Sequence, residues 1–201
     1  MFVRTESFRE YIKQYPMITA IVCINIIVYL AAFLPFLPNS TIINSLIGVN
    51  FFIQQGEIWR LVTPIFLHVS FTHFLMNSLA VVIFSPFLEK LLGKMGFLNL
   101  YLFSGIVGNL ATFILLPPTY AHLGASGSFY GLFGFYFALI LFRKHSFPKQ
   151  IRQSIMVILG LGILFTAFQP NINWIGHVFG AIGGFGFAYY FLHFGRGKYQ
   201  G

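Results

Sequence analysis

Three segments of the chain carry polar residues whose types and spacing could perform acyl-transfer chemistry. Ser126 lies in a G-A-S-G motif at 124–127, where an apolar run begins, and His177 lies within another apolar run. The unpaired N–H groups and the dipole of a helix N-terminus favour negative charge beside such a serine. His73 and Asn77 are four positions apart in a third run, so both point from one face of a helix. A serine beside a histidine base can act as a nucleophile.

These polar residues are expected to lie at one depth. With a rise of 1.5 Å per residue, Ser126 and His73 each stand about 25 Å from the basic residue that follows their run, and His177 about 28 Å. Asn77 lies one helical turn deeper than His73. Polar groups inside a membrane are costly and usually functional. The common depth therefore predicts a site near one membrane surface.

The composition explains why a membrane is involved. Hydrophobic residues make up 57% of the 201 residues, charged residues only 8%, and the mean hydropathy is +0.80. A soluble domain carries roughly a quarter charged residues, so this composition excludes a soluble globular protein. Aspartate is absent, which excludes a Ser-His-Asp triad, an aspartyl dyad and an Asp-ligated metal site. The single cysteine, Cys23, excludes an intrachain disulfide.

Apolar runs long enough to cross a bilayer define the fold class. A crossing helix needs about 20 apolar residues, and six segments of the chain approach this length. We expect an all-α polytopic membrane protein whose single domain, 1–201, contains six transmembrane helices. The predicted spans are 18–35, 71–91, 96–116, 126–142, 151–168 and 175–194. Pro86 is expected to kink the second span near its inner end.

The basic residues predict the orientation of these spans. Eleven of the twelve Lys and Arg residues fall before the first span, in the second and fourth connections, or after the last span; only Arg60 lies on the other side. Basic residues remain in the cytoplasm. The charge of +8 is thus a topology signal rather than a nucleic-acid patch, and both termini are expected to be cytoplasmic. The protein is expected to be a multi-pass protein of the cell membrane.

The first outer connection, 36–70, is much longer than the other two. Its segment 42–53 is too short to span and too apolar for water, which favours a position in the membrane interface. Trp59 is a candidate interfacial anchor. We therefore expect this loop to be embedded in the membrane.

Small residues recur on the two spans that carry Ser126 and His177. Glycines at 176, 180 and 184 surround His177, and glycines at 127, 131 and 134 follow Ser126. Such faces let membrane helices approach closely, which would bring Ser126 beside His177. Tyr130 is four positions after Ser126, where its ring could stack on the imidazole. Each feature has a purely structural alternative: Ser126 as a helix cap, the glycines as packing, and His73 with Asn77 as a hydrogen-bonded packing pair.

Taken together, these motifs resemble the rhomboid intramembrane serine proteases of the six-helix bacterial type. The motifs occur in the order of that family and cover about 15–195. The matching elements are Trp59-Arg60, His73-x-x-x-Asn77, Gly124-Ala125-Ser126-Gly127 and Gly176-His177-x-x-Gly180-x-x-x-Gly184. Gly176 departs from the alanine that is usual before the histidine, which is a change between small residues.

The resemblance implies a Ser-His dyad that needs no third acid. Ser126 would be the nucleophile and His177 the general base and then the general acid. The backbone N–H of Ser126 and the side chains of His73 and Asn77 would form the oxyanion hole. The supporting residues would be Tyr130, Gly124 and Gly127. No cofactor and no metal are expected.

The resemblance also implies the partners. Substrates would be single-pass transmembrane proteins in the lipid bilayer, cleaved near the outer face where their helix unwinds. A catalytically inactive rhomboid-like protein that binds membrane clients is the alternative, although such relatives typically lack the Ser or the His of the dyad. A transporter usually shows inverted repeats or broken helices, which this sequence lacks.

The remaining ionisable residues are predicted to lie outside the site. His68 is expected to order the outer loop, and His122, His145 and His193 are expected to be solvated or interfacial. Glu89 lies near the inner end of the second span, too far from the serine to take part. In the family the corresponding position packs between helices, which implies a structural role.

Overall fold

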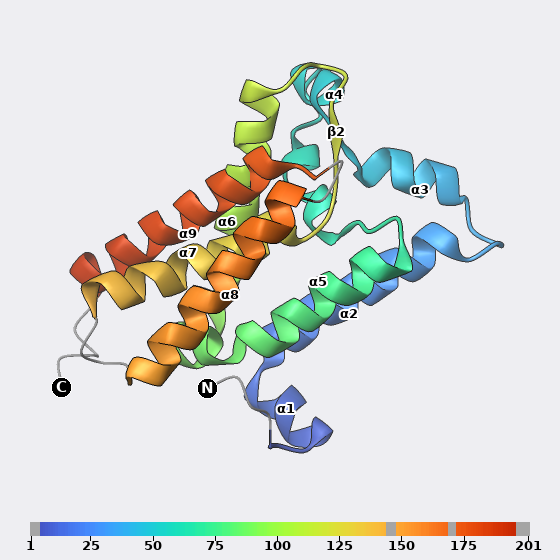
Figure 1. Ribbon diagram of the computed structural model, residues 1–201. Helices are drawn as coiled ribbons and strands as arrows, with labels where there is room; N and C mark the ends of the chain where they lie inside the picture. The colour runs from blue at the N-terminus through green and yellow to red at the C-terminus, as the bar shows by residue number, and fades with distance from the viewer. Residues whose placement is uncertain (1–4, 144–147, 169–171, 196–201) are drawn as a thin grey trace.

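The structure of the protein is a computed structural model that describes residues 5–143, 148–168 and 172–195. These residues fold into a bundle of helices with one two-stranded antiparallel sheet (Figure 1). The elements are α1 (Phe8–Gln14), α2 (Pro16–Phe33), α3 (Asn39–Leu46), β1 (Gly48–Val49), α4 (Asn50–Gln54), the 3-10 helices η1 (Ile58–Leu61) and η2 (Thr63–Phe66), α5 (Phe71–Phe84), α6 (Pro86–Leu115), β2 (Ala121–His122), α7 (Ser126–Phe142), α8 (Lys149–Phe168) and α9 (Trp174–Phe194).

The long helices have the length and surface of membrane helices. Within the described residues, α2, α6 and α9 are long and apolar enough to cross a membrane, and α5 and α7 are shorter apolar helices. Large apolar side chains such as Ile27, Ile163 and Met76 are at least 60% exposed. Exposed apolar surface on this scale marks contact with an apolar surrounding. The chain is therefore a helical multi-pass membrane protein.

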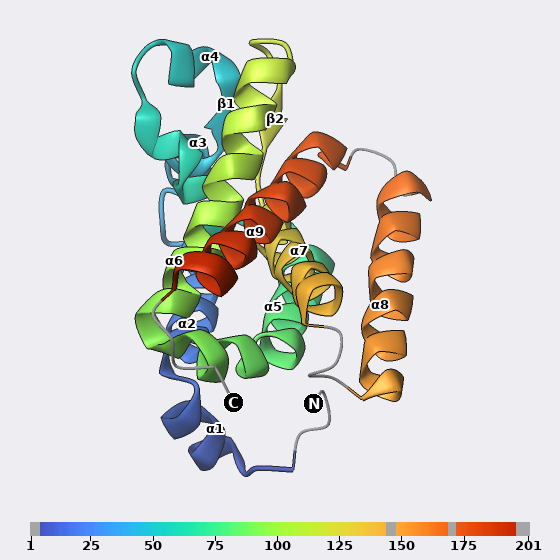
Figure 2. The same cartoon turned by 90° about the vertical axis from the view of Figure 1, so that its left-hand side faces the viewer.

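The second predicted span differs from the observed helix. α5 ends at Phe84, and α6 begins at once with Pro86 in its first turn, because proline lacks the N–H that would continue a helix and suits a helix start. Gly93 then interrupts α6 with a φ of 73°, a conformation that glycine adopts readily. Figure 2 shows the first turns of α6 running across the bundle before the helix turns upward. Pro86 thus starts a new helix instead of kinking one.

Glu89 has the structural role that the sequence indicates. Its carboxylate is 3% exposed and accepts hydrogen bonds from the backbone N–H groups of Met17 (2.9 Å) and Ile18 (3.0 Å). These groups belong to the first turn of α2 and have no partner within that helix. Glu89 therefore caps α2 and joins it to α6.

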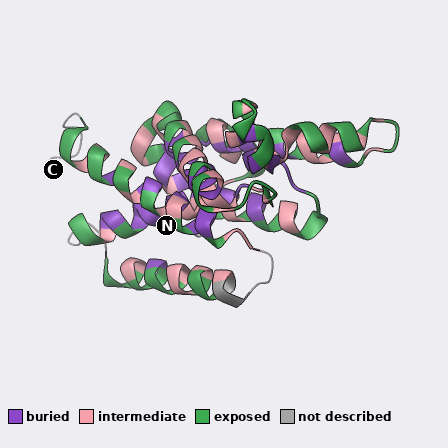
Figure 3. Cartoon of the chain, turned by 90° about the horizontal axis from the view of Figure 1, so that it is seen from above, coloured by how far each residue is buried: buried purple, intermediate pink, exposed green. Residues whose placement is uncertain are grey.

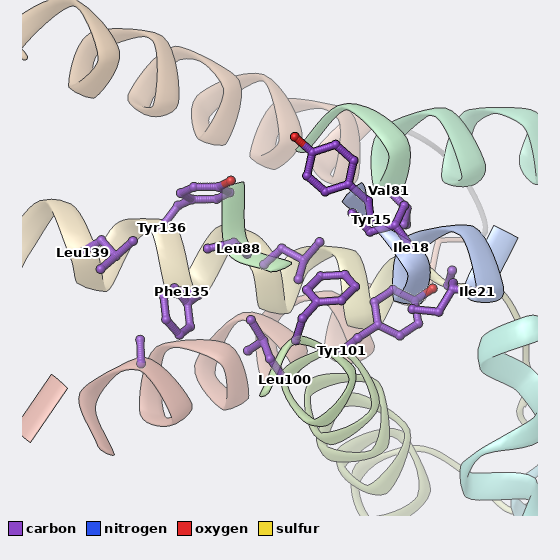
Figure 4. Packing of buried hydrophobic residues seen from close by; sticks show 14 of the residues in the cluster. Tyr15, Ile18, Ile21, Val81, Leu88, Leu100, Tyr101, Phe135, Tyr136 and Leu139 are labelled. Atoms are coloured by element: carbon purple, nitrogen blue, oxygen red, sulfur yellow. The ribbon is translucent and has the colours of Figure 1, made fainter. Parts of the chain in front are cut away.

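The core lies where α2, α5, α6 and α7 meet (Figure 4). Aromatic rings fill much of it: Phe97, Tyr101, Phe135 and Tyr136 are at most 1% exposed. By contrast, α8 lies at the edge of the bundle, as the view from above shows (Figure 3). Ile155 is the one buried residue among the described side chains of α8.

The connection 36–70 folds into a compact unit that contains α3, β1, α4, η1 and η2. Arg60, 5% exposed, donates from Nη1 to the backbone oxygens of Asn44 and Ile47 (both 2.6 Å) and from Nε to Glu57 Oε2 (2.6 Å). The loop thereby provides hydrogen-bond partners and a carboxylate for Arg60, the one basic residue predicted to lie on the other side of the membrane. Trp59 is half exposed.

This loop is tied to the segment that precedes Ser126. β1 pairs with β2 in the register Gly48 with His122 and Val49 with Ala121. The backbone N–H of Gly124 also donates to the oxygen of Pro64 in η2 (2.8 Å). The loop therefore holds the chain that enters α7.

Candidate active site

Glycines bring α7 and α9 into backbone contact. A Cβ on Gly180 would collide with the backbone oxygen of Gly127, and one on Gly184 with that of Gly131. A Cβ on Gly134 would likewise strike the backbone oxygen of Ala181. Because any larger residue would separate the helices, these glycines set the distance between α7 and α9. The predicted docking of the two glycine faces is confirmed.

Ser126 is the first residue of α7. The preceding Ala125 provides no side-chain cap, so the first N–H groups of the helix have no partner within it. Gly124 has a φ of 105°, which L side chains rarely adopt, and a Cβ there would lie 2.5 Å from Cε1 of His73. Glycine is thus required at this position for its conformation and for the space that the His73 ring occupies.

One cavity collects the residues predicted to form the site. It has a volume of about 440 Å³ and lies between α5, α7, α8 and α9. Its walls include Ser126, His177, His73, Asn77 and Tyr130. These residues come from three helices far apart in sequence, and the structure brings them to one cavity. The supporting glycines Gly124 and Gly127 flank Ser126.

The two candidate oxyanion donors lie on α5. The side-chain amide of Asn77, 8% exposed, donates from Nδ2 to the backbone oxygen of His73 (2.9 Å). An amide nitrogen carries two protons, so the second N–H of Asn77 remains for another acceptor. The backbone N–H of His73 donates to Ser70 Oγ (3.2 Å), which caps the start of α5.

His177 is held from two sides. Its ring stacks on that of Tyr130, with a centroid distance of 4.1 Å and an interplanar angle of 10°, as predicted. Its Nδ1 lies 2.9 Å from Thr166 Oγ1. Among the described residues, no hydrogen bond joins the Ser126 hydroxyl to the imidazole. Catalytic hydrogen bonds are often long in the absence of substrate and tighten in the reactive complex.

Two residues near His177 escaped the sequence reasoning. Thr166 of α8 contacts the imidazole, and Asn173 caps α9 by accepting from the N–H of Gly176 (3.0 Å) and donating to Thr112 Oγ1 (2.8 Å). Measured from Lys149, where α8 begins, Thr166 lies at a depth of about 25 Å, the same as Ser126. The sequence therefore indicates the depth of Thr166, although it does not show that α8 packs against His177.

The other histidines divide into two groups. His122, which was predicted to be solvated or interfacial, is instead buried inside the protein: it is 5% exposed, because β2 pairs with β1 and places the ring against Gly48. Burial lowers the pKa of His122 to about 4, so the ring is neutral at pH 7. His68 is fully buried in the outer loop, with Nδ1 3.2 Å from the oxygen of Phe66. His193 is exposed at the end of α9, and His145 lies outside the described residues.

Comparisons with known proteins agree with this arrangement. The family model described as "Rhomboid domain" matches residues 55–194. The chain is 41% identical over 187 residues to a protein of Bacillus subtilis named "Putative rhomboid protease YdcA", covering 92% of this chain and 93% of that protein. The protein therefore belongs to the rhomboid family.

Two further relatives match over shorter parts of their length. "Rhomboid protease GluP" of Bacillus subtilis is 38% identical over 136 residues, which are 68% of this chain and 26% of that protein. "Rhomboid-like protease 3" of Toxoplasma gondii is 31% identical over 138 residues, or 67% of this chain and 52% of that protein. The family and the protease names of these relatives support an intramembrane protease.

Across the part of the chain that the structure describes, no group of three or more His, Cys, Asp or Glu side chains could hold a metal ion.

Proposed function

We propose that this protein is an intramembrane serine endopeptidase that cleaves transmembrane substrates near the outer membrane face with a Ser126–His177 dyad. The observation that carries the proposal is the shared cavity. It is lined by the serine, the histidine and the two candidate oxyanion donors, the His73 imidazole and the Asn77 amide. The alternative is a rhomboid-like protein that binds membrane clients without cleaving them.

The first half of the reaction follows from these positions. His177 takes the proton of Ser126 Oγ while this oxygen attacks the substrate carbonyl carbon, which gives a tetrahedral oxyanion. The N–H of Ser126 and the side chains of His73 and Asn77 stabilise the negative charge. His177 then returns the proton to the leaving amine as the peptide C–N bond breaks.

Water completes the cycle. It attacks the acyl group on Ser126 while His177 accepts its proton; the carboxylic acid leaves, and the proton returns to Ser126. A cavity of about 440 Å³ has room for water as well as peptide, since a water molecule occupies about 30 Å³. Substrate helices must unwind to react, because a peptide bond inside a formed helix does not present its carbonyl to the serine.

Cleavage of a single-pass membrane protein by the purified chain in proteoliposomes tests the function. The wild type should release two fragments and react with a fluorophosphonate probe, with no effect of EDTA, because the dyad needs no metal. Ser126→Ala should neither cleave the substrate nor react with the probe. Ser128→Ala is the matched control, since this buried serine two positions away does not line the cavity. Cleavage by Ser126→Ala, or no cleavage by folded wild type in several lipids, would refute the proposed activity.

We also propose that six helices, α2 and α5 to α9, cross the membrane and that both termini are cytoplasmic. The first outer loop lies at the opposite end of the bundle from α1 and the first turn of α8 (Figure 2). This separation supports the orientation indicated by the basic residues.

Cysteine labelling tests the orientation. In a Cys23→Ser background, an impermeant maleimide applied to intact cells should modify Ser40→Cys and spare Gln150→Cys; both positions are exposed. Lysed cells serve as the control, where both should react. Labelling of Gln150→Cys alone in intact cells would invert the topology and move the site to the cytoplasmic side.

A further inference from the structure

We propose that Thr166 is a positioning residue that sets the tautomer of His177 and thereby leaves its Nε2 free to act as a base. The inference rests on the proposed function, and it adds α8 to the elements that form the site. The evidence is a chain of three hydrogen bonds that begins at the imidazole and ends on a backbone carbonyl.

The chain runs between α9, α8 and α7. His177 Nδ1 is 2.9 Å from Thr166 Oγ1, which is 2.6 Å from the Tyr130 hydroxyl oxygen, which is 2.6 Å from the backbone oxygen of Gly162. The distances are all within hydrogen-bonding range. Thr166 and Gly162 are one helical turn apart on α8, so the two atoms face the same side.

Counting protons gives this chain a direction. A backbone carbonyl only accepts, and a tyrosine hydroxyl has one proton. The short contact between Tyr130 and Gly162 therefore uses the tyrosine proton. The contact between Tyr130 and Thr166 must then use the threonine proton, and Thr166 Oγ1 is left as the acceptor for a proton on His177 Nδ1.

The alternative direction fails at the carbonyl. If Thr166 donated to Nδ1, the Tyr130 proton would have to point at Thr166. The hydroxyl oxygen of Tyr130 would then meet the Gly162 oxygen at 2.6 Å with no proton between them, which is repulsive. A threonine in a helix commonly donates to the carbonyl one turn before it. No such bond joins Thr166 to Gly162 among the described residues, and if one formed, Thr166 Oγ1 would still be left to accept from His177 Nδ1.

This direction has a chemical consequence. The tautomer protonated at Nδ1 carries its lone pair on Nε2, the form that can remove the proton from a serine. When His177 becomes cationic, the bond from Nδ1–H to Thr166 is charge-assisted and becomes stronger. The hydroxyl groups of Thr166 and Tyr130 thus orient the imidazole and stabilise its cationic form, as the carboxylate does in a Ser-His-Asp triad. This protein has no aspartate to do so.

Three substitutions separate this role from packing. Thr166→Val keeps the shape of the side chain and removes the acceptor, Thr166→Ser keeps the hydroxyl, and Tyr130→Phe keeps the stacked ring but leaves the threonine proton without its partner. Thr19→Val is the matched control, because Thr19 is also half-buried and its hydroxyl donates only to its own helix at Tyr15 (2.9 Å).

In steady-state cleavage, Thr166→Val should lower kcat by about 10- to 100-fold and leave KM within about twofold of the wild-type value. A loss of this size is typical of one hydrogen bond to a charged group. Thr166→Ser should regain most of the rate, Tyr130→Phe should lie between, and Thr19→Val should match the wild type. A loss in Thr166→Val that Thr166→Ser does not rescue, or that appears in KM alone, would assign Thr166 to packing.

A second readout does not depend on cleavage. Nitrogen-15 NMR of histidine-labelled protein in detergent reports the tautomer of each ring, and His177→Gln identifies the signals of His177. The wild type should show Nδ1 protonated, and Thr166→Val should shift toward a mixture of tautomers. An Nε2-protonated ring in the wild type overturns this inference whatever the activity. A wild type with the Nδ1 tautomer that never cleaves overturns only the proposed function.

Discussion

Ser126→Ala and His177→Ala should each reduce cleavage by at least about 10⁴-fold, and combining them should cost little more, because members of a catalytic unit act together. Ser126 supplies the attacking oxygen, and His177 supplies the base that makes this oxygen nucleophilic. Once either is absent, the other has nothing to act on. The measurement is single-turnover cleavage in proteoliposomes by the two single variants and the double variant.

The controls lie on the same two helices. Ser128→Ala on α7 and His193→Ala at the far end of α9 should cleave at nearly the wild-type rate, since neither side chain lines the cavity. Substrate capture by Ser126→Ala should equal that of the wild type. If the losses of the single variants simply multiplied in the double variant, the two residues would act independently and the dyad would be wrong.

Asn77→Ala should lower kcat by about 10²–10³-fold while KM stays nearly constant, the loss expected on removing one oxyanion donor. The charge that Asn77 would stabilise is absent from the bound substrate and present in the transition state. The backbone N–H of Ser126 and the His73 ring would still face the oxyanion, so residual activity should persist.

His73 needs a different substitution because its ring also packs over Gly124. His73→Phe keeps a ring in this space and removes the N–H donors, so it should reproduce the loss seen in Asn77→Ala. Ser78→Ala is the control on α5: this buried serine adjoins Asn77 in sequence and does not line the cavity. A folded Asn77→Ala that cleaves at the wild-type rate and only binds substrate more weakly would make Asn77 a packing residue.

Local patterns in the sequence predict part of the arrangement of this site. The rise per residue predicts one depth for Ser126, His73 and His177, and the spacing of three or four residues between the glycines identifies the faces by which α7 and α9 meet. Tyr130 was assigned to the imidazole because residues four apart share a helix face, and the rings do stack. The glycine faces and the stacking of Tyr130 on His177 are predictable because they follow from periodicities that hold within one helix.

The end of α5 shows where such patterns fail. The apolar run continues past Pro86, so hydropathy alone favours one span over 71–91. The end of α5 depends on the missing N–H of Pro86, and the later change of direction inside α6 depends on the positive φ of Gly93. Hydropathy records neither of them.

Other features were decided only by the tertiary structure. His122 is polar and lies in a short connection, which predicts solvent contact, yet its strand pairs with β1 from a loop about 70 residues earlier and buries the ring. Thr166 resembles any hydroxyl residue in an apolar helix until α8 docks beside α7 and α9. The physical reason is common to both: burial and hydrogen bonding depend on which groups meet across elements, and the rotation and offset of one element against another follow from the packing of the whole bundle.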